Sequence, residues 1–282
     1  MSSGTTLRVG VLADLHVVGD PARSASWQNP YEFAGVEERC RRAARLFARE
    51  GVELVLLLGD LAHDGDRPSL SAAVRSSAAG VPVLVVSGNH DGPAGVLEQA
   101  LDGSGARLAP LEGERVGGLL VAGLQAERED PRVWRALGAA DPGSWGDEAV
   151  LVASHFPVLS RAGRIRSHGL RFAGDMANRE EMADRLRARQ GPTVVVCGHL
   201  HVRDSCSSGR VLQLACGALV EPPFEATVLE LVVRGSALVL SRQAHELDSR
   251  PEERNPRIVP AREAWRHTPG RGWRREPAAL ST

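Results

Sequence analysis

The chain has 282 residues, which suffices for one large domain or two small ones, and such a fold buries about three quarters of its unfolded surface. It carries 34 basic and 35 acidic residues, for a formal net charge of -1. This balance excludes a general electrostatic attraction to nucleic acid or to a membrane, so we expect neither as a partner.

Nothing at the N-terminus resembles a basic segment followed by an apolar one, and every apolar run is shorter than the roughly 18 residues of a membrane span. We therefore expect a soluble, cytoplasmic protein. The four cysteines form neither a CxxC pair nor a disulfide framework, and we expect them to be reduced.

Apolar runs alternate with amphipathic stretches through the first hundred residues. We expect strands at 7–13, 52–58 and 82–86, and helices at 33–50, 68–79 and 93–102. In the first of these helices Phe33, Val36, Cys40 and Phe47 recur at helical spacing, and Gly51 follows its end. Such alternation is typical of βαβ units in a layered α/β domain.

Later apolar runs are separated by glycine-rich turns, as in a meander. They cover 107–113, 118–124, 148–154, 209–219, 224–233 and 236–244. The short connection Val233-Arg234-Gly235-Ser236 favours antiparallel pairing, so we expect mixed sheets, two of them packed together with helices outside. The arginine-rich segment from Ser160 to Asp175, before a helix at about 178–190, is interpreted as a functional loop.

The composition changes at residue 246, where the chain becomes rich in Pro, Arg and Glu. We predict one domain over 1–245 and a C-terminal tail or arm over 246–282 that packs against the body or against a neighbouring subunit. A homo-oligomer formed through this arm is therefore a prediction.

Five apolar runs end in side chains that bind metals. These ends are Asp14 and His16, then Asp60, then Asn89 to Asp91, then His155, and last His199 and His201. Side chains at i and i+2 of an extended chain share one side, so each histidine of the last pair can face the same object while Leu200 faces the core. Ligands bind outside the carboxyl ends of strands in open α/β sheets, so these side chains are expected to meet.

The ordered set D-x-H, G-D, G-N-H-D, S-H and G-H-x-H resembles the calcineurin-like metallophosphoesterase family. The resemblance implies a four-layer α-β-β-α sandwich with two mixed sheets and a site for two metal ions. By resemblance, Asp60 bridges the ions, Asp14, His16 and His201 complete one site, and Asn89, His155 and His199 complete the other. Mixed oxygen and imidazole ligation suits Mn, Fe or Zn.

The resemblance makes His90 the catalytic residue that protonates the leaving oxygen or stabilises charge on the phosphoryl group, with Asp91 orienting it. A carboxylate bound to one imidazole nitrogen fixes the tautomer and raises the basicity of the other. The alternative for Asp91 is a turn residue before Gly92-Pro93.

Other residues allow two interpretations each. Arg164, Arg166 and His168 in the arginine-rich loop are candidates for binding the substrate beyond its reacting phosphate, or belong to a solvated basic loop. His63 either supports the metal ligands together with Asp64 or is an exposed loop residue. Trp27 and Tyr31 form an aromatic wall of the pocket or pack on the following helix.

These observations favour a metal-dependent hydrolase of a small-molecule phosphoester, a phosphodiesterase or phosphomonoesterase, that uses a metal-bridging hydroxide as its nucleophile. Family members that hydrolyse cyclic nucleotides often carry an Arg two residues after G-N-H-D, where this chain has Pro93. The alternatives are a nuclease, with arginines at 161–171 and 250–275 as a local patch, or a non-catalytic protein-binding scaffold of the same fold.

Overall fold

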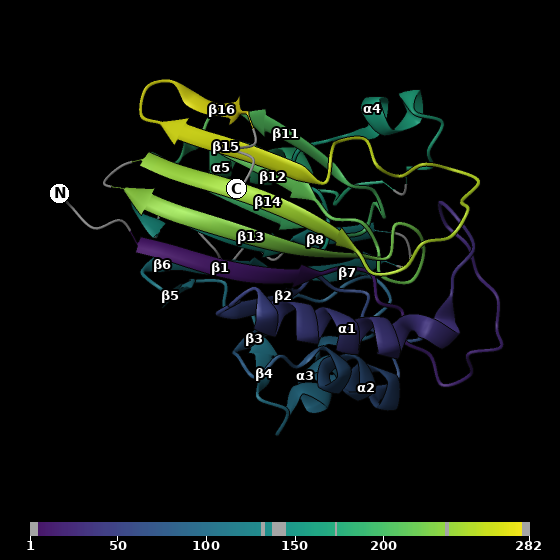
Figure 1. Ribbon diagram of the computed structural model, residues 1–282. Helices are drawn as coiled ribbons and strands as arrows, with labels where there is room; N and C mark the ends of the chain where they lie inside the picture. The colour runs from purple at the N-terminus through teal and green to yellow at the C-terminus, as the bar shows by residue number, and fades with distance from the viewer. Residues whose placement is uncertain (1–4, 131–132, 137–144, 173, 235–236, 278–282) are drawn as a thin grey trace.

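Figure 1 shows a computed structural model of the chain, which describes residues 5–130, 133–136, 145–172, 174–234 and 237–277. Its larger sheet has the strand order β16-β15-β14-β13-β1-β2-β3-β4. The strands are β1 Thr5–Leu12, β2 Leu54–Leu57, β3 Val83–Val85, β4 Ala106–Leu108, β13 Glu225–Arg234, β14 Ala237–Glu246, β15 Arg262–Thr268 and β16 Gly272–Glu276. β1 to β4 run parallel, whereas β1 and β13 to β16 pair antiparallel, so the sheet is mixed.

The second sheet has the order β11-β12-β10-β9-β6-β5, and a separate hairpin pairs β7 with β8. The strands are β5 Glu114–Val116, β6 Leu119–Leu124, β7 Ala126–Asp130, β8 Val133–Ala136, β9 Val150–Ser154, β10 Thr193–Cys197, β11 Asp204–Ser208 and β12 Val211–Ala215. Here β6, β9, β10 and β12 are parallel and the two edge strands antiparallel, so this sheet is mixed too.

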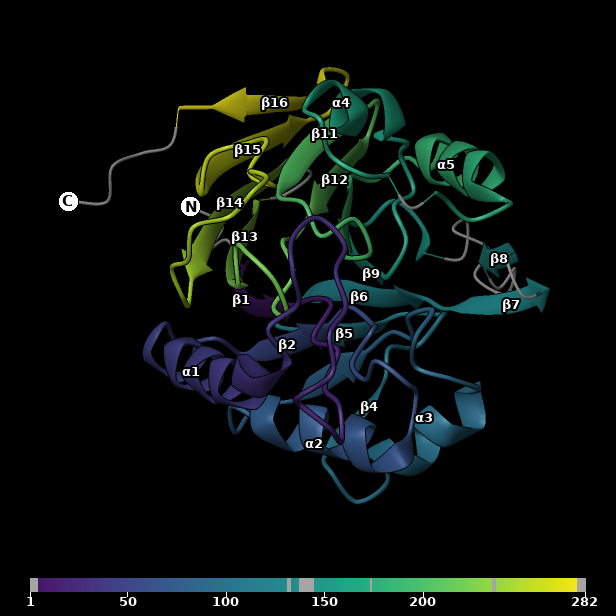
Figure 2. The same cartoon turned by 90° about the vertical axis from the view of Figure 1, so that its right-hand side faces the viewer.

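The helices cover the outer faces of the two sheets. They are a 3-10 turn η1 at Phe33–Gly35, α1 Val36–Arg49, α2 Arg67–Ser77, α3 Ala94–Leu101, α4 Ala162–Ser167 and α5 Arg179–Ala188. Figure 2 shows α1, α2 and α3 along one side of the molecule and α4 and α5 on the opposite side. No helix among the described residues is long and apolar enough to cross a membrane.

Four apolar clusters of described residues hold these layers together, and three of them show the layering. Leu56 of the larger sheet and Leu151 of the smaller one belong to a single buried cluster between the sheets. Phe47 of α1 packs with residues of the first sheet's other face, and Leu186 of α5 with residues of the second sheet's other face. The expected α-β-β-α sandwich with two mixed sheets is therefore confirmed.

Local sequence explains the main helices. α1 has Glu37 and Glu38 in its first turn and Arg49 in its last, which complements the helix dipole, and Gly51 beyond its end has a φ of 67°. Asp66 caps α2 by accepting a hydrogen bond from the backbone N–H of Ser69. These helices connect β1 to β2 and β2 to β3, as the alternating pattern predicts.

The segment expected to be a tail or arm packs against the body as strands. β15 pairs with β14 and β16 with β15, and the Trp265 and Trp273 side chains join the core between the sheets. The domain boundary at residue 245 and an oligomer through this segment stay predictions. Gly235 and Ser236 of the expected hairpin lie outside the described residues, but Arg234 and Ala237 on either side do pair antiparallel.

Candidate metal centre

The loops after β1, β2, β3, β9 and β10 meet at a cavity of about 330 Å³. The structure brings together all seven side chains that the sequence nominates as metal ligands. His16, Asp60, Asn89, His199 and His201 line the cavity, and Asp14 and His155 are buried beside them. Segments almost 190 residues apart in the chain thus supply one cluster, for example through the bond from the His199 backbone N–H to Asp14 Oδ1 at 3.0 Å.

Five of these residues share an unusual backbone conformation. Their φ angles are positive, from 50° to 65°, at Asp14, His16, Asp60, His199 and His201. The expectation that His199 and His201 lie on extended chain is wrong, because both have left-handed backbone conformations beyond the end of β10. Such conformations are strained for residues with a Cβ and cluster at functional sites. Leu200, between two of the histidines, is buried as expected.

Asp14, His16 and His201 form the first group of candidate ligands, with one ligand atom of each within 4.8 Å of the others. His201 Nε2 lies 3.5 Å from Asp14 Oδ1, and His16 Nε2 lies 3.5 Å from Asp60 Oδ2. His16 Nε2 is buried and has no hydrogen-bond partner among the described residues. A buried imidazole nitrogen without a partner is costly, and a cation beside Asp14 and Asp60 would satisfy it.

His155, Asn89 and His199 form the second group. His155 Nδ1 lies 2.8 Å from the carbonyl oxygen of Leu58, so this nitrogen carries a proton and donates it to that oxygen. His155 Nε2 then has a lone pair, yet it lies 3.0 Å from Asn89 Oδ1 and 3.2 Å from His199 Nδ1. Lone pairs that converge in this way fit a bound metal ion.

Asp60 stands between the two groups. Its Oδ2 atom lies 3.5 Å from His16 Nε2 and 3.5 Å from His155 Nε2, so one oxygen faces a ligand of each group. Its Oδ1 accepts a hydrogen bond of 2.8 Å from the backbone N–H of His90, which fixes the carboxylate. This is the position that a bridging ligand requires.

The protonation states suit metal binding for most of the groups. Burial and nearby histidines hold the pKa of His16 and of His199 well below the usual value, so both rings are neutral. Burial raises the pKa of Asp14, but His201 and other histidines outweigh it and lower the pKa, so this side chain is a carboxylate. Burial lowers the pKa of His201, yet Asp14 and Glu221 raise it to about 10.

Glu221 is a residue that sequence reasoning missed. Its fully buried carboxylate binds His201 Nδ1 and also accepts backbone N–H bonds from Gln28 and Asn29. A carboxylate behind a histidine orients the ring and raises the basicity of the metal-binding nitrogen. The only signal in the sequence is an acidic residue inside the apolar run before Pro222-Pro223.

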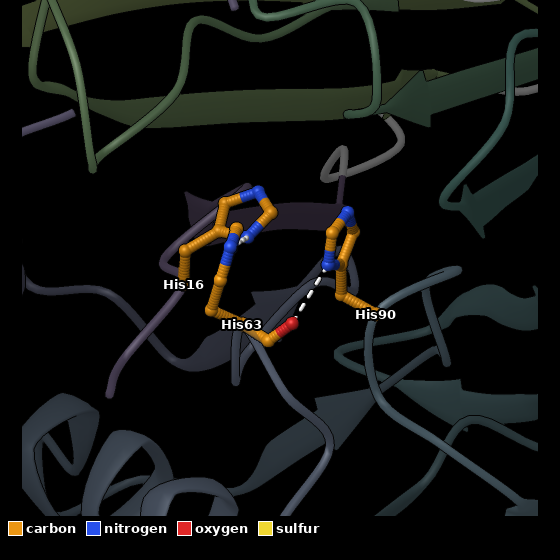
Figure 3. Close-up of side chains that lie close together, drawn as sticks. All are labelled: His16, His63 and His90. Carbon is orange, nitrogen blue, oxygen red and sulfur yellow. Dashed lines mark hydrogen bonds between the residues drawn. The ribbon is translucent and has the colours of Figure 1, made fainter. Parts of the chain in front are cut away.

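His90 lines the cavity, and His63 lies beside it, next to His16 (Figure 3). His90 Nδ1 is 2.7 Å from the His63 carbonyl oxygen, the two rings stack at 4.9 Å, and His63 Nδ1 is 3.1 Å from His16 Nδ1. His63 therefore contacts the candidate ligand His16, which agrees with the interpretation of His63 as a supporting residue. Asp64 instead forms an ion pair with Arg23.

Asp91 has a different partner from the one expected. Its carboxylate accepts backbone hydrogen bonds from Leu61 at 2.6 Å, Ala62 at 3.1 Å and Gly88 at 2.8 Å. Among the described residues no hydrogen bond joins it to His90, whose Nδ1 is held by the His63 carbonyl. The alternative interpretation of Asp91, a residue that fixes the turn, agrees with these contacts.

The expected substrate residues do not line the cavity. Arg164 Nε lies 3.5 Å from Asp204 Oδ1, the Arg166 guanidinium lies 5.3 Å from the Phe172 ring, and the His168 ring bonds to the Arg164 carbonyl. The part of this loop that reaches the cavity is Gly174 and Asp175. On the first loop, Trp27 and Tyr31 do line the cavity, as the aromatic-wall interpretation requires.

The family model described as calcineurin-like phosphoesterase matches residues 7–203, and the chain belongs to this family. No curated protein matches the chain. Among solved structures, a dimetal phosphatase from Danio rerio is 16% identical with a TM-score of 0.58, covering 89% of this chain and 99% of that one. A purple acid phosphatase from yellow lupin (Lupinus luteus) seeds is 14% identical with a TM-score of 0.51. The match covers 90% of this chain and 54% of the lupin chain. At such identities the likeness shows the fold.

Proposed function

We propose that the protein is a dinuclear metal-dependent hydrolase of a small-molecule phosphoester. The observation that carries the proposal is the place of Asp60 Oδ2, 3.5 Å from a ligand nitrogen of each histidine group. In the proposed site Asp14, His16 and His201 hold one ion, Asn89, His155 and His199 hold the other, and Asp60 bridges them. The oxygen and imidazole donors suit Mn, Fe or Zn.

When bound, two such ions lower the pKa of a water and stabilise the attacking and leaving oxygens of an in-line displacement. Proton donation and positioning depend on the protein's own side chains. Because His90 Nδ1 donates to the His63 carbonyl, Nε2 is the nitrogen free to face the leaving oxygen, and it gives a proton from the imidazolium form, leaving the neutral ring with its proton on Nδ1. The bond from the His90 backbone N–H to Asp60 couples the position of this proton donor to the bridging carboxylate.

The size and charge of the cavity support a small substrate. A volume of about 330 Å³ lies at the lower end of the range for small-molecule sites. A nucleic-acid backbone would need a track of basic side chains leading to the reacting phosphate, and none of the described residues that line the cavity is an arginine. The proposal also includes a cytoplasmic location.

The test is hydrolysis of an aryl phosphodiester and the matching aryl phosphomonoester by manganese-loaded protein. Preference for one of them assigns the diesterase or monoesterase class. His199→Ala and Asp60→Asn should each lower kcat at least a hundredfold while leaving the unfolding transition cooperative. Turnover by either variant at the native rate would exclude the metal centre as the site of the reaction.

A further inference from the structure

Aromatic residues are a much larger share of the cavity lining than of the whole sequence. Aromatic residues make up 4% of the sequence, yet four of the twelve residues that line the cavity are Trp27, Tyr31, Trp134 and Phe156. They come from the loop after β1, from β8 and from the loop after β9. Segments distant in sequence thus contribute rings to one small space, which calls for a functional explanation.

The rings flank both ligand groups. The Tyr31 ring stacks on His201 at 5.7 Å and lies 5.1 Å from His16, both of the first group. The Phe156 ring lies 4.5 Å from His199 of the second group and 5.8 Å from Trp134. An ester group attached to a phosphate held by both groups would therefore have an aromatic surface on each side.

The charged side chains in and around the cavity also bear on which ester groups can bind there. The 34 basic residues of the chain are all arginine, and none is among the described residues that line the cavity. The exposed Arg171 lies 5.8 Å over the Trp27 ring without joining the lining. The one carboxylate in the lining besides Asp60 is Asp175, whose partner is Arg179 at 2.6 Å.

The lining offers no arginine to bind a second phosphate or a carboxylate on the substrate, and such a group would lose its hydration there without a basic partner, which disfavours it. A flat uncharged ring would bury apolar area and stack on the tryptophans. Given the proposed phosphoesterase function, we propose that the cavity selects phosphoesters whose ester group is an uncharged aromatic ring, held between the Trp27 and Tyr31 side and the Trp134 and Phe156 side.

Calorimetric titration of the full, manganese-loaded chain tests the selection without turnover. The probes are phenylphosphonate, cyclohexylphosphonate, which has a ring of similar size without π electrons, and 4-carboxyphenylphosphonate, which adds a charge. We expect phenylphosphonate to bind about threefold to tenfold more tightly than the cyclohexyl compound. The carboxylated compound should bind at least about tenfold more weakly than phenylphosphonate.

Two variants and a matched control test which side chains cause the preference for the phenyl ring. Trp27→Leu and Trp134→Leu should each reduce the phenyl preference to less than about twofold, because leucine is apolar but has no ring on which a phenyl group can stack. Phe172→Leu makes the same kind of change at a ring outside the cavity lining and should keep the preference. An unchanged preference in both leucine variants would overturn the assignment of the walls.

Hydrolysis of phenyl phosphate and cyclohexyl phosphate in the same samples separates the two proposals. Turnover with equal affinity for the phenyl and cyclohexyl phosphonates overturns the aromatic selection and leaves the hydrolase standing. A phenyl preference in binding without turnover of either ester, or of the aryl phosphodiester, supports the aromatic site and overturns the hydrolase. Binding of none of the three probes overturns both.

Discussion

His63 and His16 contact each other through their Nδ1 atoms, 3.1 Å apart. One of these nitrogens must donate a proton and the other must accept it. His16 needs the lone pair of Nε2 for a metal ion, since that atom is buried beside Asp60 without another partner among the described residues. The proton of His16 therefore sits on Nδ1, and His63 fixes this tautomer by accepting it.

The first prediction follows from that contact. His63→Ala removes the acceptor for His16 but leaves the backbone carbonyl that holds His90, so the expected defect is in metal binding. The affinity of the first site for Mn should fall about tenfold to a hundredfold. Calorimetric titration of metal-free protein measures it. His245→Ala on β14 is the control and should bind as the native protein does; an unchanged affinity in His63→Ala would contradict the tautomer argument.

The second prediction concerns the proton on His201. With a pKa of about 10 in the metal-free fold against about 6.5 when unfolded, this proton stabilises the metal-free protein fully below about pH 6.5 and ceases to do so as the pH rises through about 10. A metal ion must displace it. Titration with Mn at pH 8 should therefore release about one proton, measured from the heats in two buffers of different ionisation enthalpy.

Glu221→Gln is the matched variant for that measurement. It keeps the shape of the side chain behind His201 and removes one of the two charges, Asp14 and Glu221, that raise the pKa of His201, so fewer protons should be released at pH 8. Metal affinity should also fall, by about tenfold or more. Equal heats in the two buffers for the native protein would show that His201 is already neutral and would contradict the prediction.

The sequence predicts most of the site because each nominated side chain follows a strand, and strand ends meet at one edge of the sheets. It does not predict the partners behind them. Glu221 lies 20 residues beyond His201 and reaches it only through the bend before β13. Trp134 and Phe156 join the cavity through the packing of β8 on the loop after β9, a contact that no local pattern encodes.

The sequence does not predict the last two strands, β15 and β16, for a different reason. The inward positions of β15 are Glu263, Trp265 and His267, so the alternation of buried and exposed residues is not an alternation of apolar and polar ones. Glu263 is buried because it forms ion pairs with Arg242 of β14 and with Arg275 of β16. Charge pairing across the sheet therefore replaces the apolar pattern on which strand prediction depends.

The third prediction separates Asp91 from the chemistry. Its carboxylate accepts three backbone N–H bonds from the loops after β2 and β3, whereas an asparagine has one acceptor oxygen and would turn an NH₂ group toward a donor. Asp91→Asn should lower the free energy of unfolding by about 1–3 kcal/mol, measured by urea denaturation. Asp64→Asn, at an exposed ion pair, should change it by less than about 1 kcal/mol. Native stability in Asp91→Asn would favour the role beside His90 instead.

The fourth prediction concerns the close approach of two loops at the bridging carboxylate. A Cβ added at Gly88 would lie 2.2 Å from both the backbone nitrogen and the Oδ1 atom of Asp60, and a backbone atom cannot move aside as a flexible side chain can. Gly88→Ala must therefore displace Asp60, together with its bond to His90. We expect metal content after dialysis to fall well below two ions per chain and stability to fall by about 1–3 kcal/mol.

Gly95→Ala in α3 is the control for that substitution. Nothing lies within 4 Å of its added Cβ, and alanine favours the helix, so stability should hold or rise by up to about 1 kcal/mol, with metal content unchanged. If Gly88→Ala kept both its ions and its stability, the loops after β2 and β3 would have to separate without disturbing Asp60. The fixed position of that carboxylate could then no longer support its assignment as the bridge.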